Sequence, residues 1–244
     1  DDPQLSMASA IAVEMIHCAS LVHDDLPCFD NADMRRGQTS VHKEFGERLA
    51  VLTGDALIVM AYQTVAAASR RSAQRLAPII KTISQGVGAP FGIIAGQAWE
   101  CEPQAALSDY QRAKTGALFS AATAAGAQAA GSDAETWKGL GEWLGEAYQV
   151  ADDIRDVMGQ SLQLGKPVGQ DAHHGRPSTA ADLGLVGAVA YFRQLMQAAI
   201  NSVPACTSRE AMRQLVLHES ERLLPQSACD QIAGGQIAEH RALA

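Results

Sequence analysis

Positive charge, aromatic side chains and closely spaced cysteines are all scarce in this chain of 244 residues. Lys and Arg number 19 against 27 Asp and Glu, and the net charge of −8 argues against a nucleic-acid partner and leaves no polybasic membrane anchor. Aromatic residues make up only 5% of the chain, and a hydrophobic content of 47% with a charged content of 19% suits a soluble globular protein. The five cysteines are scattered without a Cys-x-x-Cys spacing, which predicts reduced thiols in a cytoplasmic protein.

Membrane spans, signal peptides and β-strands are also missing from the predicted features. The longest run of small apolar residues, 117–131, is too short and too rich in Gly and Ala to cross a bilayer. No signal peptide is visible, and the chain begins at Asp1 rather than Met, so we expect an N-terminal piece to be missing from it. No segment alternates polar and apolar residues between turn signals, so no strands are predicted.

Helical periodicity is the dominant pattern. In residues 4–25, apolar side chains such as Met7, Ile11 and Met15 recur at three- and four-residue spacing, and Pro27 ends the pattern. Further helices are expected over 46–69, 72–85, 88–101, 108–131, 134–159, 179–203 and 207–224. We therefore predict an all-α fold, a single helical domain over residues 1–244 with a central apolar cavity between helices.

One segment departs from this pattern. Residues 159–178, GQSLQLGKPVGQDAHHGRPS, contain Gly, Pro, Ser and His where a helix would otherwise continue. A structureless stretch of about 20 residues is uncommon in a compact domain and more often serves a function than fills space. We therefore expect this segment to form a lid.

Two acidic clusters stand far apart in the sequence, each in an otherwise apolar helical segment. The first lies in HDDLPCFDNADMRRG and contains Asp24, Asp25 and Asp30. The second lies in YQVADDIRDVMG and contains Asp152, Asp153 and Asp156. Burying so many carboxylates is too costly unless a cation neutralises them, and Mg²⁺ usually brings substrate phosphates with it. Two such clusters facing one cavity would suit a diphosphate substrate.

The second cluster has the simpler predicted geometry. Asp152 and Asp156 are four residues apart and share one helix face, which Gln149 joins from one turn earlier. Like charges at this spacing destabilise a bare helix by a few tenths of a kcal/mol, about 0.2–0.5, unless a cation bridges them. The alternative is a solvated acidic helix face, and the apolar neighbours of the cluster weaken it.

The first cluster is expected at a helix C-terminus. Asp24 and Asp25 immediately precede Pro27, where anions oppose the helix dipole, and a bound cation would reverse that effect. Arg35 and Arg36 follow, and paired arginines suit bidentate phosphate recognition. The alternative for the arginines is a surface ion pair with Asp33 or Glu44.

Other candidate ligands rest on weaker patterns. Lys114, Thr115 and Lys166 could contact phosphate, although a lone Lys is usually a solvated surface group. His17 lies on the same predicted helix as Asp24, where a lone His more often makes a structural hydrogen bond. The spacing of His173 and His174 indicates no specific role, although two adjacent histidines could bind metal adventitiously.

The two motifs resemble those of the trans-isoprenyl diphosphate synthases, also called polyprenyl synthases. HDDLPCFDNADMRRG is similar to their first aspartate-rich motif, in the bacterial form with four residues between the Asp pair and the third Asp, and ADDIRD is similar to their second. SVHKEFGERLAVLTGDALI, FGIIAGQAWECE, AKTGALF and LGKPVGQD resemble further family segments in the expected order. The resemblance covers residues 5–225 and is greatest to bacterial enzymes of the geranylgeranyl diphosphate synthase type.

The resemblance implies a Mg²⁺-dependent prenyltransferase with an isoprenoid synthase-type bundle, usually a homodimer. It would condense isopentenyl diphosphate with an allylic diphosphate (dimethylallyl, geranyl or farnesyl) to supply isoprenoids such as carotenoid precursors. Three groups of site residues are implied. The metal ligands would be Asp24, Asp25, Asp30, Asp152, Asp153 and Asp156; the allylic diphosphate would contact Arg35, Lys114, Thr115, Gln149 and Lys166; isopentenyl diphosphate would contact Arg36 and His17. Asp24, Asp30, Arg35, Lys114, Asp152 and Lys166 would serve catalysis.

Product length would depend on Ala19 and Ser20, one turn before the first Asp. Family members that make farnesyl diphosphate often carry a large aromatic residue at the position matching Ala19, so Ala19 predicts geranylgeranyl diphosphate. The alternative is that Ala19 is an ordinary small core residue. In that case Ile16 or Met60 would close the cavity that holds the growing chain.

Departures from the family pattern keep other functions open. The Gly-Gly-Lys-x-x-Arg-Pro motif that binds isopentenyl diphosphate in many relatives is missing, so we expect the N-terminal helices of the family to be missing as well. Gln170 stands in the lid where many relatives have Lys. The alternatives are a farnesyl diphosphate synthase, a non-catalytic subunit of a heteromeric synthase, a terpene cyclase, or an acidic bundle that binds proteins.

Overall fold

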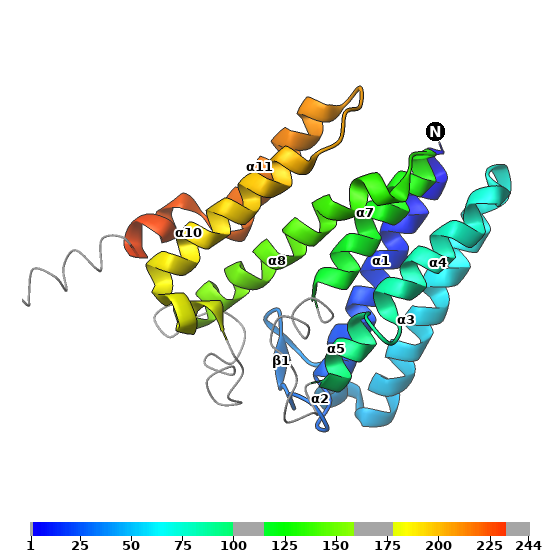
Figure 1. Cartoon of the computed structure of the whole chain (residues 1–244). Helices are drawn as coiled ribbons and strands as arrows, with labels where there is room; N and C mark the ends of the chain where they lie inside the picture. The colour runs from blue at the N-terminus through cyan, green and yellow to red at the C-terminus, as the bar shows by residue number, and fades with distance from the viewer. Residues whose placement is uncertain (1, 100–114, 159–177, 233–244) are drawn as a thin grey trace, which may run out of the picture.

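A computed structural model describes residues 2–99, 115–158 and 178–232, and it confirms the all-α prediction (Figure 1). The order of the helices and strands is as follows. The elements are α1 (Pro3–Asp24), β1 (Met34–Arg35), β2 (Gln38–Thr39), α2 (Val41–Phe45), α3 (Glu47–Ala68), two 3₁₀ turns (Ser69–Arg71 and Ala73–Arg75), α4 (Leu76–Val87), α5 (Ile93–Trp99), α7 (Ala117–Ala130), α8 (Ala134–Met158), α10 (Thr179–Ser202) and α11 (Arg209–Leu223).

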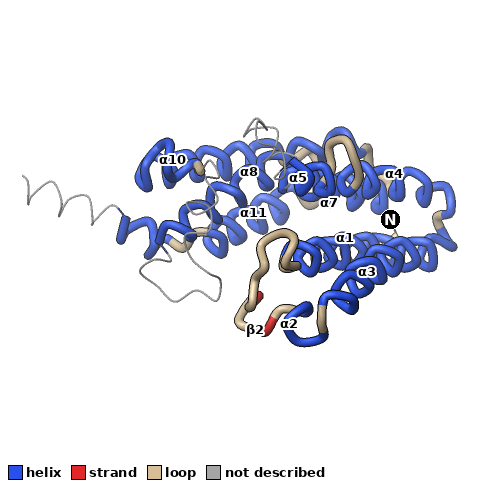
Figure 2. Tube along the Cα trace, turned by 90° about the horizontal axis from the view of Figure 1, so that it is seen from below, coloured by secondary structure: helices blue, strands red, loops and turns tan. Residues whose placement is uncertain are grey.

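The helices form two packed groups, and Figure 2 shows α1 and α3 in one and α8 and α10 in the other. In one, α1 packs against α3 and α7, and α4 packs against α7, around aliphatic residues such as Leu5, Ile16, Val65 and Ile83. In the other, α8 packs against α10 around a core that includes Phe192. The pair α7 and α8 joins the two groups, which lie on either side of it in Figure 1.

The contact between α7 and α8 is close because glycines of α8 face the backbone of α7. A Cβ atom added to Gly141 would lie 2.5 Å from the carbonyl oxygen of Phe119 and 2.5 Å from the Cα of Ser120. One added to Gly145 would lie 2.7 Å from the Cα of Gly116. Since Asp152 and its neighbours lie further along α8, this contact helps to set the position of the second acidic cluster.

Replacing Gly141 with Ala is expected to destabilise the protein by about 1–3 kcal/mol, because its methyl group would meet backbone that cannot move aside. Gly139 on the same helix is the matched control, since nothing lies within 4 Å of an added Cβ there. Gly139→Ala is expected to gain up to about 1 kcal/mol from helix propensity. Urea denaturation of both variants measures the difference, and equal stabilities would contradict the close contact.

The prediction of no strands is wrong at one short hairpin, which follows the first cluster. Met34 pairs with Thr39 and Arg35 with Gln38 in an antiparallel ladder. The two loop residues have positive φ, 51° at Arg36 and 76° at Gly37, as in a type I′ hairpin turn. A strand of two residues is too short to show alternation, so the sequence pattern could not reveal it.

Several predicted helix limits also differ from the structure. The helix expected over 88–101 is α5, which begins only at Ile93, after a bend at 88–92 that contains Pro90. The helix expected over 72–85 begins as a 3₁₀ turn and continues as α4 to Val87. Within α10, Gly184 has a non-helical φ of 67°, so the predicted helix over 179–203 is broken there. Almost all of the predicted lid lies outside the described residues.

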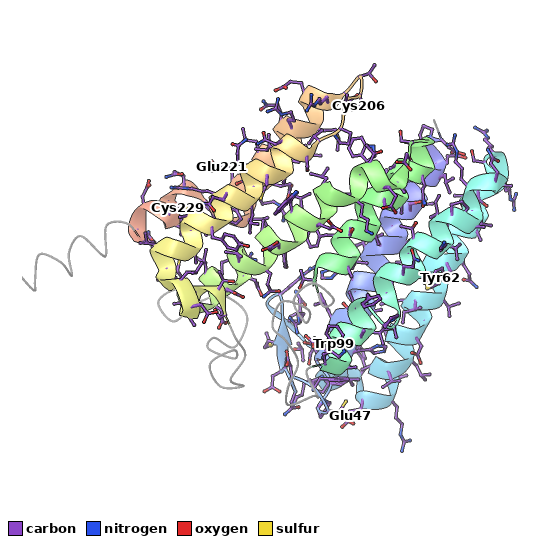
Figure 3. All side chains as sticks on the ribbon, viewed as in Figure 1. Glu47, Tyr62, Trp99, Cys206, Glu221 and Cys229 are labelled. Carbon is purple, nitrogen blue, oxygen red and sulfur yellow. The ribbon has the colours of Figure 1, made fainter. Side chains whose placement is uncertain are left out.

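The cysteines of the described residues are free thiols, as predicted. Cys18, Cys28, Cys206 and Cys229 are unpaired, and Figure 3 shows Cys206 and Cys229 well apart on the α10–α11 side of the molecule. Cys101 lies outside the described residues. The dispersed positions agree with a protein that does not rely on disulfides.

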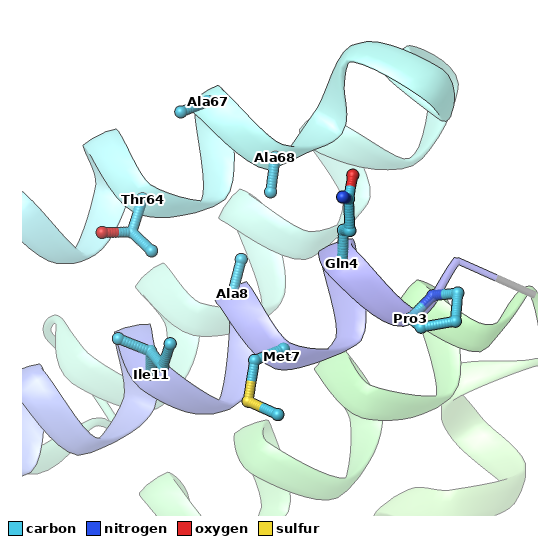
Figure 4. A pocket seen from close by; sticks show the side chains of 8 residues that line it. All are labelled: Pro3, Gln4, Met7, Ala8, Ile11, Thr64, Ala67 and Ala68. Carbon is cyan, nitrogen blue, oxygen red and sulfur yellow. The ribbon is translucent and has the colours of Figure 1, made fainter.

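A shallow apolar groove lies between the N-terminal half of α1 and the C-terminal end of α3. Its lining includes Met7, Ile11 and Thr64, as Figure 4 shows. Figure 1 places this end of α1 opposite the end that carries Asp24. The groove is therefore distinct from the cavity that the sequence predicts between the two acidic clusters, and that cavity stays a prediction.

Within the part of the chain that the structure describes, three helices could cross a membrane by length and composition alone: Pro3–Asp24, Glu47–Arg71 and Thr179–Ser202. All three are longer than the run 117–131, which is the longest stretch of small apolar residues in the sequence. Part of each apolar window, between 22% and 33%, is buried inside the fold. The absence of a membrane span stays a prediction.

Candidate active site

The first acidic cluster is folded into one place by a turn at the end of α1. The helix ends at Asp24 and Asp25 is its C-cap, as the position of Pro27 predicted. The backbone amide of Asp30 then donates to the carbonyl of Asp24 at 3.0 Å, and that of Ala32 donates to the carbonyl of Asp25 at 3.1 Å. The turn therefore brings Asp30 back next to Asp24, although six residues separate them in the sequence.

Arg35 lies among the three acids of this cluster. Its Nε donates to Oδ1 of Asp25 at 2.8 Å, its Nη2 contacts the same oxygen, and Nη2 lies 3.6 Å from Oδ2 of Asp24. Burial acts to lower the pKa of Arg35, but the hydrogen bond and charge of Asp25, with the charges of Asp24 and Asp30, raise that pKa above its usual value. The guanidinium is thus a permanent cation within the cluster.

A surface ion pair with Asp33, one of the two alternatives for Arg35, is excluded by this geometry. Asp33 instead pairs with Lys43, with 2.8 Å between its Oδ1 and Nζ. Both of these side chains are largely exposed, whereas Arg35 and Asp25 are 17% and 4% exposed. Arg35 is therefore part of the acidic cluster and not of a surface ion pair.

Arg36 and His17 meet, as the resemblance implied for two ligands of one substrate. Nη2 of Arg36 lies 3.1 Å from Nε2 of His17. Since a guanidinium can only donate, this nitrogen of His17 is the acceptor, and the imidazole carries its proton on Nδ1 when neutral. The type I′ turn, which holds Arg36 at positive φ, directs it back toward α1.

The second cluster has one buried carboxylate, that of Asp153, next to the partly exposed carboxylates of Asp152 and Asp156. Asp153 is 2% exposed, and its two oxygens accept from Nε2 of Gln149 at 2.9 Å and from the backbone amide of Thr179 at 2.8 Å. Burial raises the pKa of Asp153 above its ordinary value, with a smaller contribution from Asp152, while the two hydrogen bonds oppose that rise. The bond to Thr179 ties α8 to the first residue of α10.

Gln149 lies on α8 one turn before Asp152, as the helical spacing predicted, but the carboxylate that it contacts is that of Asp153. It is four residues before Asp153 and bonds to that carboxylate, while its Oε1 accepts from Oγ1 of Thr115 at 2.9 Å. The structure thus brings together Thr115 and Gln149, two residues that the resemblance assigned to the allylic diphosphate. Lys114 and Lys166, assigned to the same ligand, and Gln170 lie outside the described residues.

Asp152 and Asp156 are partly buried on α8. Oδ1 of Asp152 lies 3.2 Å from Nη2 of Arg155. In Figure 1 the C-terminal ends of α1 and α8 both lie on the lower side of the molecule. With Arg35 on Asp25 and Arg155 on Asp152, each cluster contains an arginine bonded to one of its carboxylates.

Gln97 is a residue of the site that sequence reasoning missed. Its Nε2 donates to Oδ1 of Asp24 at 2.9 Å, from α5 and across 73 residues of chain. The segment FGIIAGQAWECE, which carries Gln97, was noted only as a family resemblance. Thr179 and Arg155 were missed as well, and for Arg155 the available signal was its spacing of three residues from Asp152 on one helix.

The two candidate chain-length residues differ in burial, since Ala19 is buried and Ser20 is partly buried. Ala19 is 1% exposed and continues the core-facing stripe of Ala12 and Ile16 on α1. The hydroxyl of Ser20 donates to the backbone carbonyl of His17 at 2.8 Å. Neither observation tests their effect on product length, which stays a prediction.

The donor set suits Mg²⁺ bound together with a phosphate ligand. Among the described residues, no three side chains of Asp, Glu, His or Cys are placed to hold one ion by themselves. Mg²⁺ is commonly held by one or two carboxylates, with water and substrate phosphates completing its shell. Paired carboxylates without a third protein ligand are consistent with that mode of binding.

Comparisons with known proteins agree with this geometry. The sequence matches the polyprenyl synthetase family over residues 1–215, and the chain belongs to that family. It is 49% identical over 225 residues to geranylgeranyl diphosphate synthase of Cereibacter sphaeroides, covering 92% of this chain and 78% of that protein. The corresponding enzyme of Rhodobacter capsulatus is 45% identical, covering 88% of this chain and 75% of that protein.

A solved structure shares the fold. Geranyltransferase from Helicobacter pylori, complexed with magnesium and isoprenyl diphosphate, aligns with a TM-score of 0.72 at 31% identity, covering 89% of this chain and 74% of that one. The class that fold and site define is thus the isoprenyl diphosphate synthases, and the two similar bacterial enzymes named above are geranylgeranyl diphosphate synthases.

Proposed function

We propose that this protein is a prenyltransferase that condenses an allylic diphosphate with isopentenyl diphosphate, head to tail, to make geranylgeranyl diphosphate. The observation that carries the proposal is the pair of acidic clusters, each with one buried, hydrogen-bonded carboxylate next to a more accessible one. The names of the similar bacterial enzymes favour geranylgeranyl over farnesyl diphosphate as the product.

The carboxylates divide into two roles in this proposal. Asp24, Asp30, Asp152 and Asp156 are partly accessible and would hold Mg²⁺ through the diphosphate. Asp25 is bonded to Arg35, and both oxygens of Asp153 are already bonded to protein donors. They are therefore less suited to binding a metal directly, and their main role would be to fix the ends of α1 and α8.

The proposed reaction breaks the carbon–oxygen bond of the allylic diphosphate, and the electron pair leaves with the diphosphate. Bound Mg²⁺ would neutralise charge on that leaving group. Arg35 adds a fixed positive charge at the same cluster, and a fixed cation needs no reorganisation as charge develops. The double bond of isopentenyl diphosphate then forms the new carbon–carbon bond, and a proton passes to the released diphosphate. Apolar walls would keep water from the carbocation.

Arg36 and His17 form the proposed contact for isopentenyl diphosphate. Arg36 is exposed, so its guanidinium can reach an incoming phosphate while one Nη remains on His17. A guanidinium binds phosphate through two parallel hydrogen bonds, which orients the substrate as well as attracting it.

The direct test is to incubate purified protein with isopentenyl and farnesyl diphosphates, with and without Mg²⁺, and to identify the product by mass. Metal-dependent formation of geranylgeranyl diphosphate is expected. Metal-dependent product that stops at farnesyl diphosphate, when geranyl diphosphate is the starter, would favour the farnesyl synthase alternative. No turnover in the full-length protein would favour a non-catalytic subunit.

Ala19→Tyr is expected to shift the main product from geranylgeranyl to farnesyl diphosphate, because a phenol ring at this position would fill the space for the growing chain. Ala19 is 1% exposed, so the ring also overpacks the site, at a cost of about 1–3 kcal/mol in stability. Ala199→Tyr on α10 is the control, because it overpacks an equally buried position, 0% exposed, in the other packed group. Mass analysis of the products of Ala19→Tyr measures the change in chain length. An unchanged product would show that Ala19 does not line the cavity that holds the growing chain.

Three further features belong to the proposal. The protein acts as a homodimer, as is usual in the family, and it works in the cytoplasm without a membrane span. Its product supplies isoprenoid biosynthesis, including carotenoids by analogy with the family.

A further inference from the structure

Arg155 lies on α8 beside Asp152 and makes three contacts within that helix. Its Nη2 is 3.2 Å from Oδ1 of Asp152, and its Nε donates to the backbone carbonyl of Ala151 at 3.2 Å. Its guanidinium carbon lies 5.7 Å from the centre of the Tyr148 ring. Two of the three contacts do not involve Asp152, so the guanidinium has a place to remain if Asp152 takes another partner.

Arg35 and Arg155, the arginines bonded to carboxylates of the two clusters, differ in how firmly they are held. Arg35 is 17% exposed and bonds to Asp25, which is 4% exposed, so breaking that pair would leave a buried charge. Arg155 and Asp152 are 36% and 38% exposed, and water can replace either partner. An exposed pair three residues apart on a helix is weak, and a divalent cation is a stronger partner for the same carboxylate oxygen.

We propose that Arg155 is an exchangeable counter-ion of Asp152, which yields that carboxylate to Mg²⁺ and so sets the Mg²⁺ concentration at which the second cluster fills. This inference rests on the proposed function of the site. Before the metal binds, Arg155 offsets the charge of Asp152 next to the buried Asp153. As the metal binds, Nη2 releases Asp152 while Nε keeps its bond to the carbonyl of Ala151. Arg155 is thus a positioning residue that acts through Asp152.

The test compares the wild-type chain with Arg155→Gln, which removes the charge, and Arg155→Lys, which keeps it. The matched control is Arg222→Gln on α11, where Nε of Arg222 lies 2.7 Å from Oε2 of Glu219, again three residues apart and exposed. Each protein is titrated with Mg²⁺ in the presence of inorganic pyrophosphate. The midpoint is read by calorimetry and by the shift in melting temperature, so turnover is not needed.

The Mg²⁺ midpoint of Arg155→Gln is expected to fall about two- to fivefold, because a competing partner of modest strength has been removed. Arg155→Lys is expected to stay close to wild type, and Arg222→Gln to be unchanged. A midpoint for Arg155→Gln equal to or above that of wild type would overturn the inference. If wild type itself shows no Mg²⁺-dependent binding of pyrophosphate, the proposed function fails, and this inference fails with it.

Discussion

Replacing Arg35 with Met is expected to destabilise the protein by about 3–5 kcal/mol, because it leaves the carboxylate of Asp25 buried without its counter-ion. Asp25 is 4% exposed, so water cannot take over the role of the guanidinium without local unfolding. The same change removes the fixed cation of the first cluster, so prenyl transfer should be lost as well. Urea denaturation measures the first effect, and a product assay measures the second.

Two comparison variants separate these effects. Adding Asp25→Asn to Arg35→Met removes the unpaired charge, so part of the stability should return while activity should not. Lys43→Met breaks the exposed pair with Asp33 and is expected to change little, since such pairs contribute little to stability. If Arg35→Met unfolds at the same urea concentration as Lys43→Met, the pair with Asp25 is not the buried contact described above.

Replacing Asp24 or Asp152 with Ala is expected to reduce prenyl transfer by about 1,000-fold or more. Each change removes a carboxylate proposed to hold Mg²⁺, whose stabilisation of transition-state charge amounts to several kcal/mol, and each 1.36 kcal/mol is about a tenfold change in rate. Both residues are partly exposed, so the fold should survive the loss. Initial rates at saturating Mg²⁺ measure the effect.

The control for these two variants is Asp230→Ala, an exposed acid in the C-terminal part of the chain that bonds to Gln226. It should retain wild-type activity. Melting curves of all three variants distinguish a lost ligand from a lost fold. Activity within tenfold of wild type in both Asp24→Ala and Asp152→Ala would rule out the proposed metal sites.

Much of the fold could be predicted from the sequence because helical periodicity is local. The spacing of Met7, Ile11 and Met15 marked α1, and Pro27 marked its end, since both signals act within a few residues. The hairpin that carries Arg35 was not predictable in the same way. Its strands are two residues long, and its turn depends on the positive φ of Arg36, which is not a residue typical of that conformation.

The sequence by itself determined the chemistry: two clusters of aspartates, arginines beside the first, and a resemblance to one family of diphosphate-using enzymes. The tertiary structure decided which of these groups are buried and what they contact. It showed Arg35 bonded to Asp25 rather than to Asp33, Gln149 bonded to Asp153, and Gln97 bonded to Asp24. Residue types and local spacing are properties of the sequence itself, whereas burial and long-range partners are set only when distant helices pack together.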